Sequence, residues 1–486
     1  MNAAVATRSW CLVVVLCLLP SAPARAQAPP TGAALAHHPE VAAALTVLDT
    51  WIAAAVSDRE LPGLAIGIVH DQGLLWAKGY GWADPDRRIA ATPATAYRIG
   101  SLSKLLTTTA IMQLRDAGKL RLDDPVAAHL PWFQMRGLEA GAPPISIRHL
   151  LTHTGGLPRE VPGFVWNDPR PVAAADVHRV LPATDVIYPV ERRWKYSNLA
   201  YGVLGEVVAA ASGEPWDRYV EAHILRPLGM NGTRALPGAD MPGLAPSFGR
   251  RIPGAPREPR PHVDLGWLSS AGSLASTVED LARFVSLQFR EGPAGGAQAL
   301  SGWSVREMHR PQWMGAGETG QGLGFALRRV GTEMRVGHGG ALAGFRAGLN
   351  FVTERKLGVI VLTNSADGAR GVTDQAFTIV GAAVAKATER PRAARGADPA
   401  WAAYVGTYAS SVASSEIQIT VLDGELTLLS PDADNPWTSR IVLQPIGAHT
   451  FRMQTGWAAG EALRFELDAA GRVARIVGPG VVLRPR

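Results

Sequence analysis

A serine and a lysine three residues apart are the first candidates for chemistry in this sequence. Ser101 and Lys104 open a mostly apolar run, 105–114, which predicts a buried helix that begins near Ser101. Residues three apart share a helix face, so we expect the hydroxyl and the amine at hydrogen-bonding distance. A serine becomes a good nucleophile when a base takes its proton, and burial lowers the pKa of a lysine towards that task. The pair predicts nucleophilic catalysis, and an N-capping serine beside a solvated lysine is the structural alternative.

Two later segments carry groups that a serine nucleophile can use. Tyr196 and Asn198 lie on the approach to an apolar helix, before its first turn, where both side chains can point the same way. His338, Gly339 and Gly340 follow a predicted strand, and such glycine density permits close approach of the backbone to a ligand. A tyrosine anchor and an asparagine cap are the structural alternatives for the first pair.

Two other patterns are weaker candidates. His149 and His153 have metal-ligand spacing on a predicted helix capped by Ser146, but no third ligand lies nearby and structural histidines are favoured. Residues 315–320 match the glycine pattern of dinucleotide-binding loops, yet no strand precedes them, so we dismiss the match. The sequence therefore predicts no metal site.

The first 26 residues have the composition of a secretory signal peptide. Arg8 precedes an apolar core, and Ala24-Arg25-Ala26 supplies the small residues of a cleavage site before Gln27. The core has about ten residues, half of a bilayer span, and no other stretch is expected to be long enough to cross a membrane. We therefore expect a mature chain without a transmembrane segment, located in the periplasm or secreted.

Cysteine usage and charge exclude several classes of function. Both cysteines, Cys11 and Cys17, lie in the predicted leader, so the mature chain can form no disulfide and no thiol nucleophile. The formal charge of +6 becomes +4 once Arg8 and Arg25 leave, because residues 1–26 contain no acid. So small a charge without a long basic run argues against nucleic-acid binding, despite a pI near 9.5.

The hydrophobic pattern predicts two domains after the leader. An N-terminal hairpin over 64–80, four strands between residues 324 and 364, and intervening helices indicate an α/β (α+β) domain over 27–390. Its sheet should be mainly antiparallel and flanked by helices. A charged linker at 389–399 precedes residues 400–486, whose short alternating strands predict a small all-β barrel or sandwich.

The order of the three motifs, Ser101-x-x-Lys104, Tyr196-x-Asn198 and His338-Gly339-Gly340, resembles the class C β-lactamase-like and penicillin-binding-protein-like serine hydrolases. The resemblance spans about residues 40–385 and is reinforced at 147–158, 227–230, 276–284 and 337–345. It implies the helix-flanked sheet of serine β-lactamases. The C-terminal part resembles the small β domain that several members carry.

The resemblance implies a role for each motif. Ser101 would be the acyl-accepting nucleophile, Lys104 and Tyr196 the proton-transferring pair, and Asn198 a ligand for a substrate amide. Which of Lys104 and Tyr196 is the base stays open. The N–H groups of Ser101 and of a residue just after the His-Gly-Gly motif would form the oxyanion hole. No metal or organic cofactor is required.

One motif departs from the family pattern. β-Lactamases and peptidoglycan carboxypeptidases of this type have Lys-Thr-Gly where this chain has His338-Gly339-Gly340, and the histidine is similar to esterase and aminopeptidase-like members. An imidazole that is mostly neutral at pH 7 offers a carboxylate little charge, so we expect esters to be favoured over penicillins. Alternatively, another cation such as Arg346 binds the carboxylate and His338 only packs.

These observations predict an exported serine acyl hydrolase that forms an acyl-enzyme on Ser101 and acts on small-molecule esters, amides or peptides. A β-lactamase or D-alanyl-D-alanine carboxypeptidase-like enzyme is the alternative within the same class. A catalytically idle ligand-binding protein is the alternative from another class, and it is less favoured because Ser101, Lys104, Tyr196 and Asn198 are all present.

Overall fold

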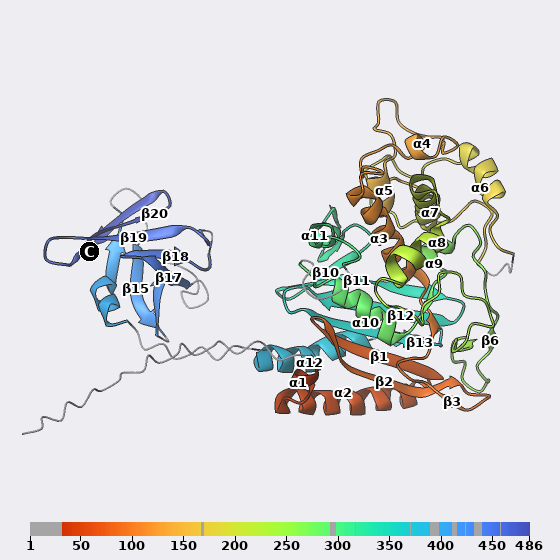
Figure 1. Ribbon diagram of the computed structural model, residues 1–486, viewed down its shortest axis with the longest axis horizontal. Helices are drawn as coiled ribbons and strands as arrows, with labels where there is room; N and C mark the ends of the chain where they lie inside the picture. Colours follow the sequence, from red (N-terminus) through yellow and green to blue (C-terminus); the bar gives the residue numbers. More distant parts are fainter. Residues whose placement is uncertain are drawn as a thin grey trace, which may run out of the picture. The chain divides into compact units, whose positions relative to one another are not determined.

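Figure 1 shows the computed structural model, which describes residues 32–166, 170–291, 298–315, 317–369, 371–388, 398–410, 416–422, 424–431, 440–456 and 458–486. The chain divides into two units, Met1–Thr388 and Glu389–Arg486. The predicted signal peptide and residues 389–397 of the predicted linker lie outside the described residues.

An antiparallel sheet forms the centre of the first unit, which confirms the predicted fold class. Its order is β3-β2-β1-β13-β12-β11-β10-β9-β8, so the first long strand pairs with the last one. The bounds are β1 Gly63–His70, β2 Gly73–Asp84, β3 Ile89–Ala90, β8 Trp313–Met314, β9 Thr319–Gln321, β10 Ala326–Val330, β11 Glu333–Leu342, β12 Phe345–Val352 and β13 Leu357–Thr363. β1 and β13 are almost continuously apolar because both faces of the sheet are covered at its centre.

Helices cover the two faces of this sheet (Figure 1). α2 (Pro39–Asp58) and α12 (Val372–Thr388) pack on one face, and α10 (Val278–Leu287) packs on the other against β1, β2 and β13. The remaining helices are α1 Gly32–Ala36, α3 Ser103–Asp116, α4 Val126–His129, α5 Ile147–Leu151, α6 Ala174–Val180, α7 Asn198–Ser212, α8 Trp216–Val220, α9 Ser269–Gly272 and α11 Gly302–His309. Short turns of helix are η1 Gly100–Leu102, η2 Leu181–Ala183, η3 Glu221–Leu225 and η4 Pro399–Tyr404. Two small ladders join β4 Tyr97–Arg98 to β7 Ala275–Ser276, and β5 Ser247–Phe248 to β6 Pro259–Arg260.

α2 corrects the expectation that no stretch beyond the leader is long enough to cross a membrane. Within the described residues it is the one helix whose length and composition would allow a membrane span. Its buried residues recur at helical spacing (Val41, Leu45, Leu48, Ile52, Val56), and they belong to the core cluster that includes the apolar strand residues of β1 and β13. This is the pattern of an amphipathic helix that covers a sheet.

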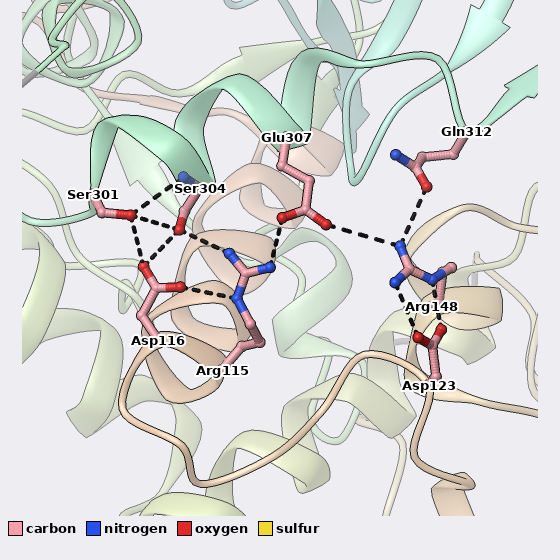
Figure 2. A network of polar contacts seen from close by, with 8 residues as sticks. All are labelled: Arg115, Asp116, Asp123, Arg148, Ser301, Ser304, Glu307 and Gln312. Atoms are coloured by element: carbon pink, nitrogen blue, oxygen red, sulfur yellow. Dashed lines mark hydrogen bonds and ion pairs between the residues drawn. The ribbon is translucent and has the colours of Figure 1, made fainter.

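A polar network joins the end of α3 to α5 and α11 (Figure 2). Arg115 Nη1 lies 2.6 Å from Glu307 Oε2, and Arg148 Nε lies 2.7 Å from Asp123 Oδ1. Arg148 Nη1 is also 4.0 Å from Glu307, so two arginines share that carboxylate. Single exposed pairs contribute about 0.2–1 kcal/mol, but a network of partly buried charges resists screening better. The network of Figure 2 therefore connects α11 to α3, the helix that follows Ser101.

The second unit is a closed eight-stranded barrel, which decides between the two predicted all-β forms. Its strands are β14 Gly406–Ala409, β15 Glu416–Leu422, β16 Glu425–Leu429, β17 Ile441–Gly447, β18 Thr450–Met453, β19 Ala462–Leu467, β20 Val473–Gly478 and β21 Val481–Pro485. Tyr404 stacks on Phe465 at 4.4 Å, and Phe451 meets Phe465 edge-on at 5.5 Å. Closure leaves no unpaired edge strand.

Candidate active site

Ser101 lies in the turn between β4 and α3. The predicted helix starts as the 3-10 turn η1 and becomes α-helical at Ser103, so the Ser101 N–H belongs to the first turn and has no intrahelical partner. Gly100 precedes it with φ +53°, and a Cβ there would lie 2.6 Å from Ala341 N. Only glycine permits this close approach between the turn and β11.

Lys104 lies one turn beyond Ser101, as its spacing predicted, and is fully buried. Its Nζ donates to Asn198 Oδ1 at 2.8 Å and to the Ala271 carbonyl at 2.7 Å, and it lies 3.3 Å from Ser101 Oγ. Burial lowers the pKa of Lys104, and the Arg159 charge acts in the same direction, while Tyr196 and Glu160 raise it. The apolar helix face therefore disfavours the ammonium form, as expected from the sequence.

Tyr196 completes the contacts of the serine. Its hydroxyl donates to Ser101 Oγ at 2.9 Å, although the two residues lie in different segments of the chain. The Tyr196 ring lies 4.6 Å from the His153 ring, with Lys104 Nζ at 5.0 Å and the Arg159 guanidinium at 5.1 Å from its centroid. The Arg159 guanidinium beside this electron-rich ring helps to hold the phenol in place.

Asn198 is the first residue of α7, so the expectation that it precedes the first turn is wrong. Ser197 is the N-cap instead, and its hydroxyl accepts from Ala200 N at 2.9 Å. Asn198 Oδ1 accepts from Lys104, while Nδ2 donates to the two oxygens of Glu160 at 2.8 and 3.1 Å. The amide thus links a carboxylate to the lysine, and a substrate amide would have to displace one of these contacts.

β11 brings the His-Gly-Gly motif to the serine. The sequence predicted that the strand ends at Gly337, but β11 continues to Leu342, because its second half pairs with β12 through Ala341 and Arg346. β10 pairs only with residues 333–337, so this second half has an open edge towards η1. A Cβ on Gly340 would lie 1.9 Å from the Ile99 carbonyl, so strand and turn touch backbone to backbone. This contact brings the Ala341 N–H beside Ser101.

His338 is partly exposed at this edge. Its Nδ1 lies 2.6 Å from the Gly339 carbonyl, which can only accept, so Nδ1 carries a proton. Burial and the Lys104 charge lower the pKa of His338 to about 4, so the ring is neutral at pH 7 and Nε2 presents a lone pair. A lone pair repels a carboxylate, whereas the family's lysine would attract one.

His149 and His153 are structural, and they do not share a helix as predicted, because α5 ends at Leu151 and His153 follows it with φ +60°. His149 closes a capping box with Ser146 and contacts Glu191 through Nε2 at 3.0 Å. His153 Nδ1 accepts from Ser197 N at 3.2 Å, and burial holds the pKa of His153 well below its usual range. Among the described residues no group of three or more His, Cys, Asp or Glu side chains is arranged to hold a metal ion.

Two cavities adjoin these groups. The arginine cleft, of about 530 Å³, is lined by Ser101, Asn198 and residues 341–344 together with Arg159, Arg260 and Arg346. The tryptophan cavity, of about 370 Å³, is lined by His338, Gly339, Trp194 and Trp313. The Tyr196 ring lies 6.1 Å from that of His338 and 6.2 Å from that of Trp194, on the side of the tryptophan cavity.

Comparison with known proteins identifies the family. Residues 48–383 match the family model described as beta-lactamase. The chain belongs to the β-lactamase family. This confirms the resemblance inferred from the three motifs, within a family of serine hydrolases that act on small molecules.

Curated relatives of this β-lactamase-family chain include a protein described as a putative penicillin-binding protein. Protein flp of Staphylococcus aureus (strain MW2) is 26% identical over 319 residues, which are 65% of this chain and 62% of the relative. The putative penicillin-binding protein PbpX of Bacillus subtilis (strain 168) is 29% identical over 226 residues, 45% of this chain and 52% of the relative. The chain therefore matches less than two thirds of the length of either protein.

Solved structures share the fold. A β-lactamase/D-alanine carboxypeptidase from Pseudomonas syringae has a TM-score of 0.60 at 21% identity and covers 70% of this chain and 99% of its own. The octameric penicillin-binding protein homologue from Pyrococcus abyssi has a TM-score of 0.59 at 22% identity and covers 90% of this chain and 99% of its own.

Within this β-lactamase-family fold, sequence reasoning missed two contributors to the site. Glu160 holds the Asn198 amide, and the Ala271 carbonyl accepts from Lys104. Glu160 lies two residues beyond the segment 147–158 that carried the resemblance, so extending that match was a usable signal. The Ala271 carbonyl is a backbone group, for which no residue type gives a signal.

Proposed function

We propose that this protein is an exported serine acyl hydrolase that forms an acyl-enzyme on Ser101 and acts on esters or small amides. The arrangement around one atom carries the proposal: Ser101 Oγ lies 2.9 Å from Tyr196 Oη and 3.3 Å from Lys104 Nζ. A hydroxyl held by two proton-transferring groups at the start of a helix has no evident structural purpose. It fits nucleophilic catalysis.

Lys104 is the better candidate for the base that takes the Ser101 proton. Its two short contacts, to Asn198 and to Ala271, use the two protons of a neutral amine. The lone pair then faces Ser101 Oγ, the most distant of the three neighbours. Burial favours this neutral form.

In the proposed acylation step, each proton transfer is assigned to a named residue. Ser101 Oγ loses its proton to Lys104 and bonds to the substrate carbonyl carbon, while the carbonyl oxygen becomes an anion held by the N–H groups of Ser101 and Ala341. When the carbon–oxygen or carbon–nitrogen bond breaks, Tyr196 gives its proton to the leaving group and recovers one from Lys104. Water repeats the sequence on the acyl-enzyme and releases the acid.

The neutral His338 favours uncharged leaving groups. Because its Nε2 presents a lone pair to the substrate, an alcohol or amine product that donates a hydrogen bond suits this side better than a carboxylate. Esters should therefore react faster than penicillins or peptides that end in D-Ala-D-Ala.

The proposal of export rests on the predicted leader at residues 1–26, and N-terminal sequencing of the secreted protein should begin at Gln27.

Intact-mass measurement after reaction with a fluorophosphonate tests the nucleophile. We expect one adduct per chain and none in Ser101→Ala, with Ser103→Ala, two residues further along the chain, as a matched control. Labelling that persists in Ser101→Ala would contradict the assignment. Absence of labelling and of ester turnover in the unmodified protein would favour an idle binding protein.

A further inference from the structure

The arginine cleft places positive charge beside the nucleophile. Arg159, Arg260 and Arg346 line it with Ser101 and Asn198, and its described lining residues include no aspartate or glutamate. We propose that this cleft binds a carboxylate on the acyl part of the substrate. The inference rests on the proposed acylation of Ser101 and names a substrate class for it.

Arg346 is one of the three arginines that line the cleft. It lies on β12 directly across from Ala341, whose N–H is proposed for the oxyanion hole. Its Nη1 donates to the Phe345 carbonyl at 2.8 Å, and within the described residues it forms no ion pair with an acid. Asp367, whose charge reaches Arg346, is already bound by Arg257 and by the N–H of Arg251.

The surroundings of Arg346 favour an incoming anion. Burial and the neighbouring Arg250 lower the pKa of Arg346, although a guanidinium remains protonated at any ordinary pH. A half-buried cation without an ion-pair partner is costly, and a carboxylate matches the planar fork of its donors. A substrate anion would supply the missing charge.

Arg260 and Arg159 can also bind a ligand carboxylate, because the ion pair that each forms is weak. Arg260 Nη2 lies 3.1 Å from Glu258, and their side chains are 42% and 70% exposed. Arg159 Nε lies 3.2 Å from Glu160, and its side chain is 60% exposed. Ion pairs with exposed arginine side chains are weak, so a ligand carboxylate can compete for either guanidinium.

A neighbouring cavity extends the positive region. It has a volume of about 350 Å³ and shares Arg260 and His262 with the cleft, while Arg87 and Arg98 line its remainder. Arg98 donates to the Ser273 and Val263 carbonyls, both at 3.0 Å, and so fixes the loop between the two cavities. The one acid in its described lining is Asp84.

The cleft lies on the acyl side of the scissile bond. Tyr196, which protonates the leaving group, is close to His338 and Trp194, and these two residues line the tryptophan cavity. The leaving group therefore departs towards that cavity. The acyl chain extends the opposite way, past Asn198 and Ala341 into the arginines.

Two esters with the same leaving group test this inference. The mono-4-nitrophenyl ester of fumarate carries a carboxylate where 4-nitrophenyl crotonate carries a methyl group, and its rigid trans double bond prevents self-cyclisation. We expect Arg346→Met to lower the fumarate-to-crotonate ratio of kcat/KM by about tenfold or more, because a charge-assisted hydrogen bond is lost. Arg260→Met should lower it less. The ratio cancels intrinsic ester reactivity and any general loss of activity.

Arg306→Met is the matched control, because this arginine stacks on Trp303 in α11 and does not line the cleft. It should leave the ratio unchanged, whereas added salt should raise KM for the fumarate ester alone. Fluorophosphonate labelling of Ser101 verifies that each variant is folded, and weaker inhibition of Arg346→Met by succinate gives a second readout. A ratio unaltered by both arginine changes would overturn the inference while Ser101 acylation stands. No labelling and no turnover of either ester would overturn the proposed function instead.

Discussion

The two units of this protein bury different kinds of side chain. In the first unit, Arg98, Lys104, His153, Asp280 and Arg335 are ionisable groups with less than a tenth of their surface exposed. In the described part of the barrel, the one buried polar residue is Thr427. Buried charges lower stability unless they are paired, so a fold accumulates them where chemistry or binding requires them. The buried ionisable groups of the described residues therefore lie in the first unit, which also holds the candidate active site, whereas the barrel core is apolar apart from Thr427 and tyrosine hydroxyls.

The test with the largest expected effect replaces Lys104 or Tyr196, the two groups that are proposed to transfer protons. Lys104→Met or Tyr196→Phe should lower kcat for an ester by about 10²- to 10⁴-fold, the usual contribution of proton transfer. Steady-state assays with 4-nitrophenyl acetate measure the loss, and Tyr201→Phe in α7 is a matched control. Full activity in both variants would show that the buried polar cluster is only structural.

A second test perturbs the barrel core. Phe465 packs against Tyr404 and Phe451, so Phe465→Ala should lower the free energy of unfolding of the barrel by about 3–5 kcal/mol. Calorimetry should show one transition shifted, with Ser101 labelling unchanged.

A chain that ends at Arg395 should also keep its labelling, as the proposed domain boundary implies. If either change abolishes labelling, the two units do not fold independently.

The third test restores the family's cation at the open edge of β11. His338→Lys replaces a lone pair with a positive charge, so cephalosporin hydrolysis relative to ester hydrolysis should rise about 10- to 150-fold, corresponding to about 1.5–3 kcal/mol. Comparison of kcat/KM for the two substrates in both forms measures it. Efficient cephalosporin hydrolysis by the unmodified enzyme would show that another cation already serves this side.

The smallest expected effect concerns Glu160 as a positioning residue. Its charge raises the pKa of Lys104, so Glu160→Gln should lower that pKa and move the acidic limb of the pH–kcat/KM profile to lower pH. Glu160→Ala should shift the limb likewise and also lower kcat/KM about tenfold, because Asn198 Nδ2 loses its acceptor. A limb that moves in neither variant would leave Glu160 with a structural role.

Local patterns in the sequence were sufficient to predict much of the fold and part of the candidate site. The Ser101–Lys104 contact follows from a spacing of three on one helix, and the strands of both units follow from alternation and turn residues. The course of β11 through Gly339 and Gly340 was missed, because pairing with β12 outweighs the weak strand preference of glycine.

The sequence alone therefore determined the Ser101–Lys104 contact, the motif order and the two kinds of fold, since each depends on neighbours within a few residues or on the family pattern. The tertiary structure decided what surrounds them: Glu160 on the Asn198 amide, Ala341 against Gly100, and Arg346 beside the serine. These contacts join segments far apart in the chain, and they form only when the sheet and helices pack and bring backbone groups together. No local periodicity encodes such contacts, so the positive charge of the arginine cleft became apparent only in the folded chain.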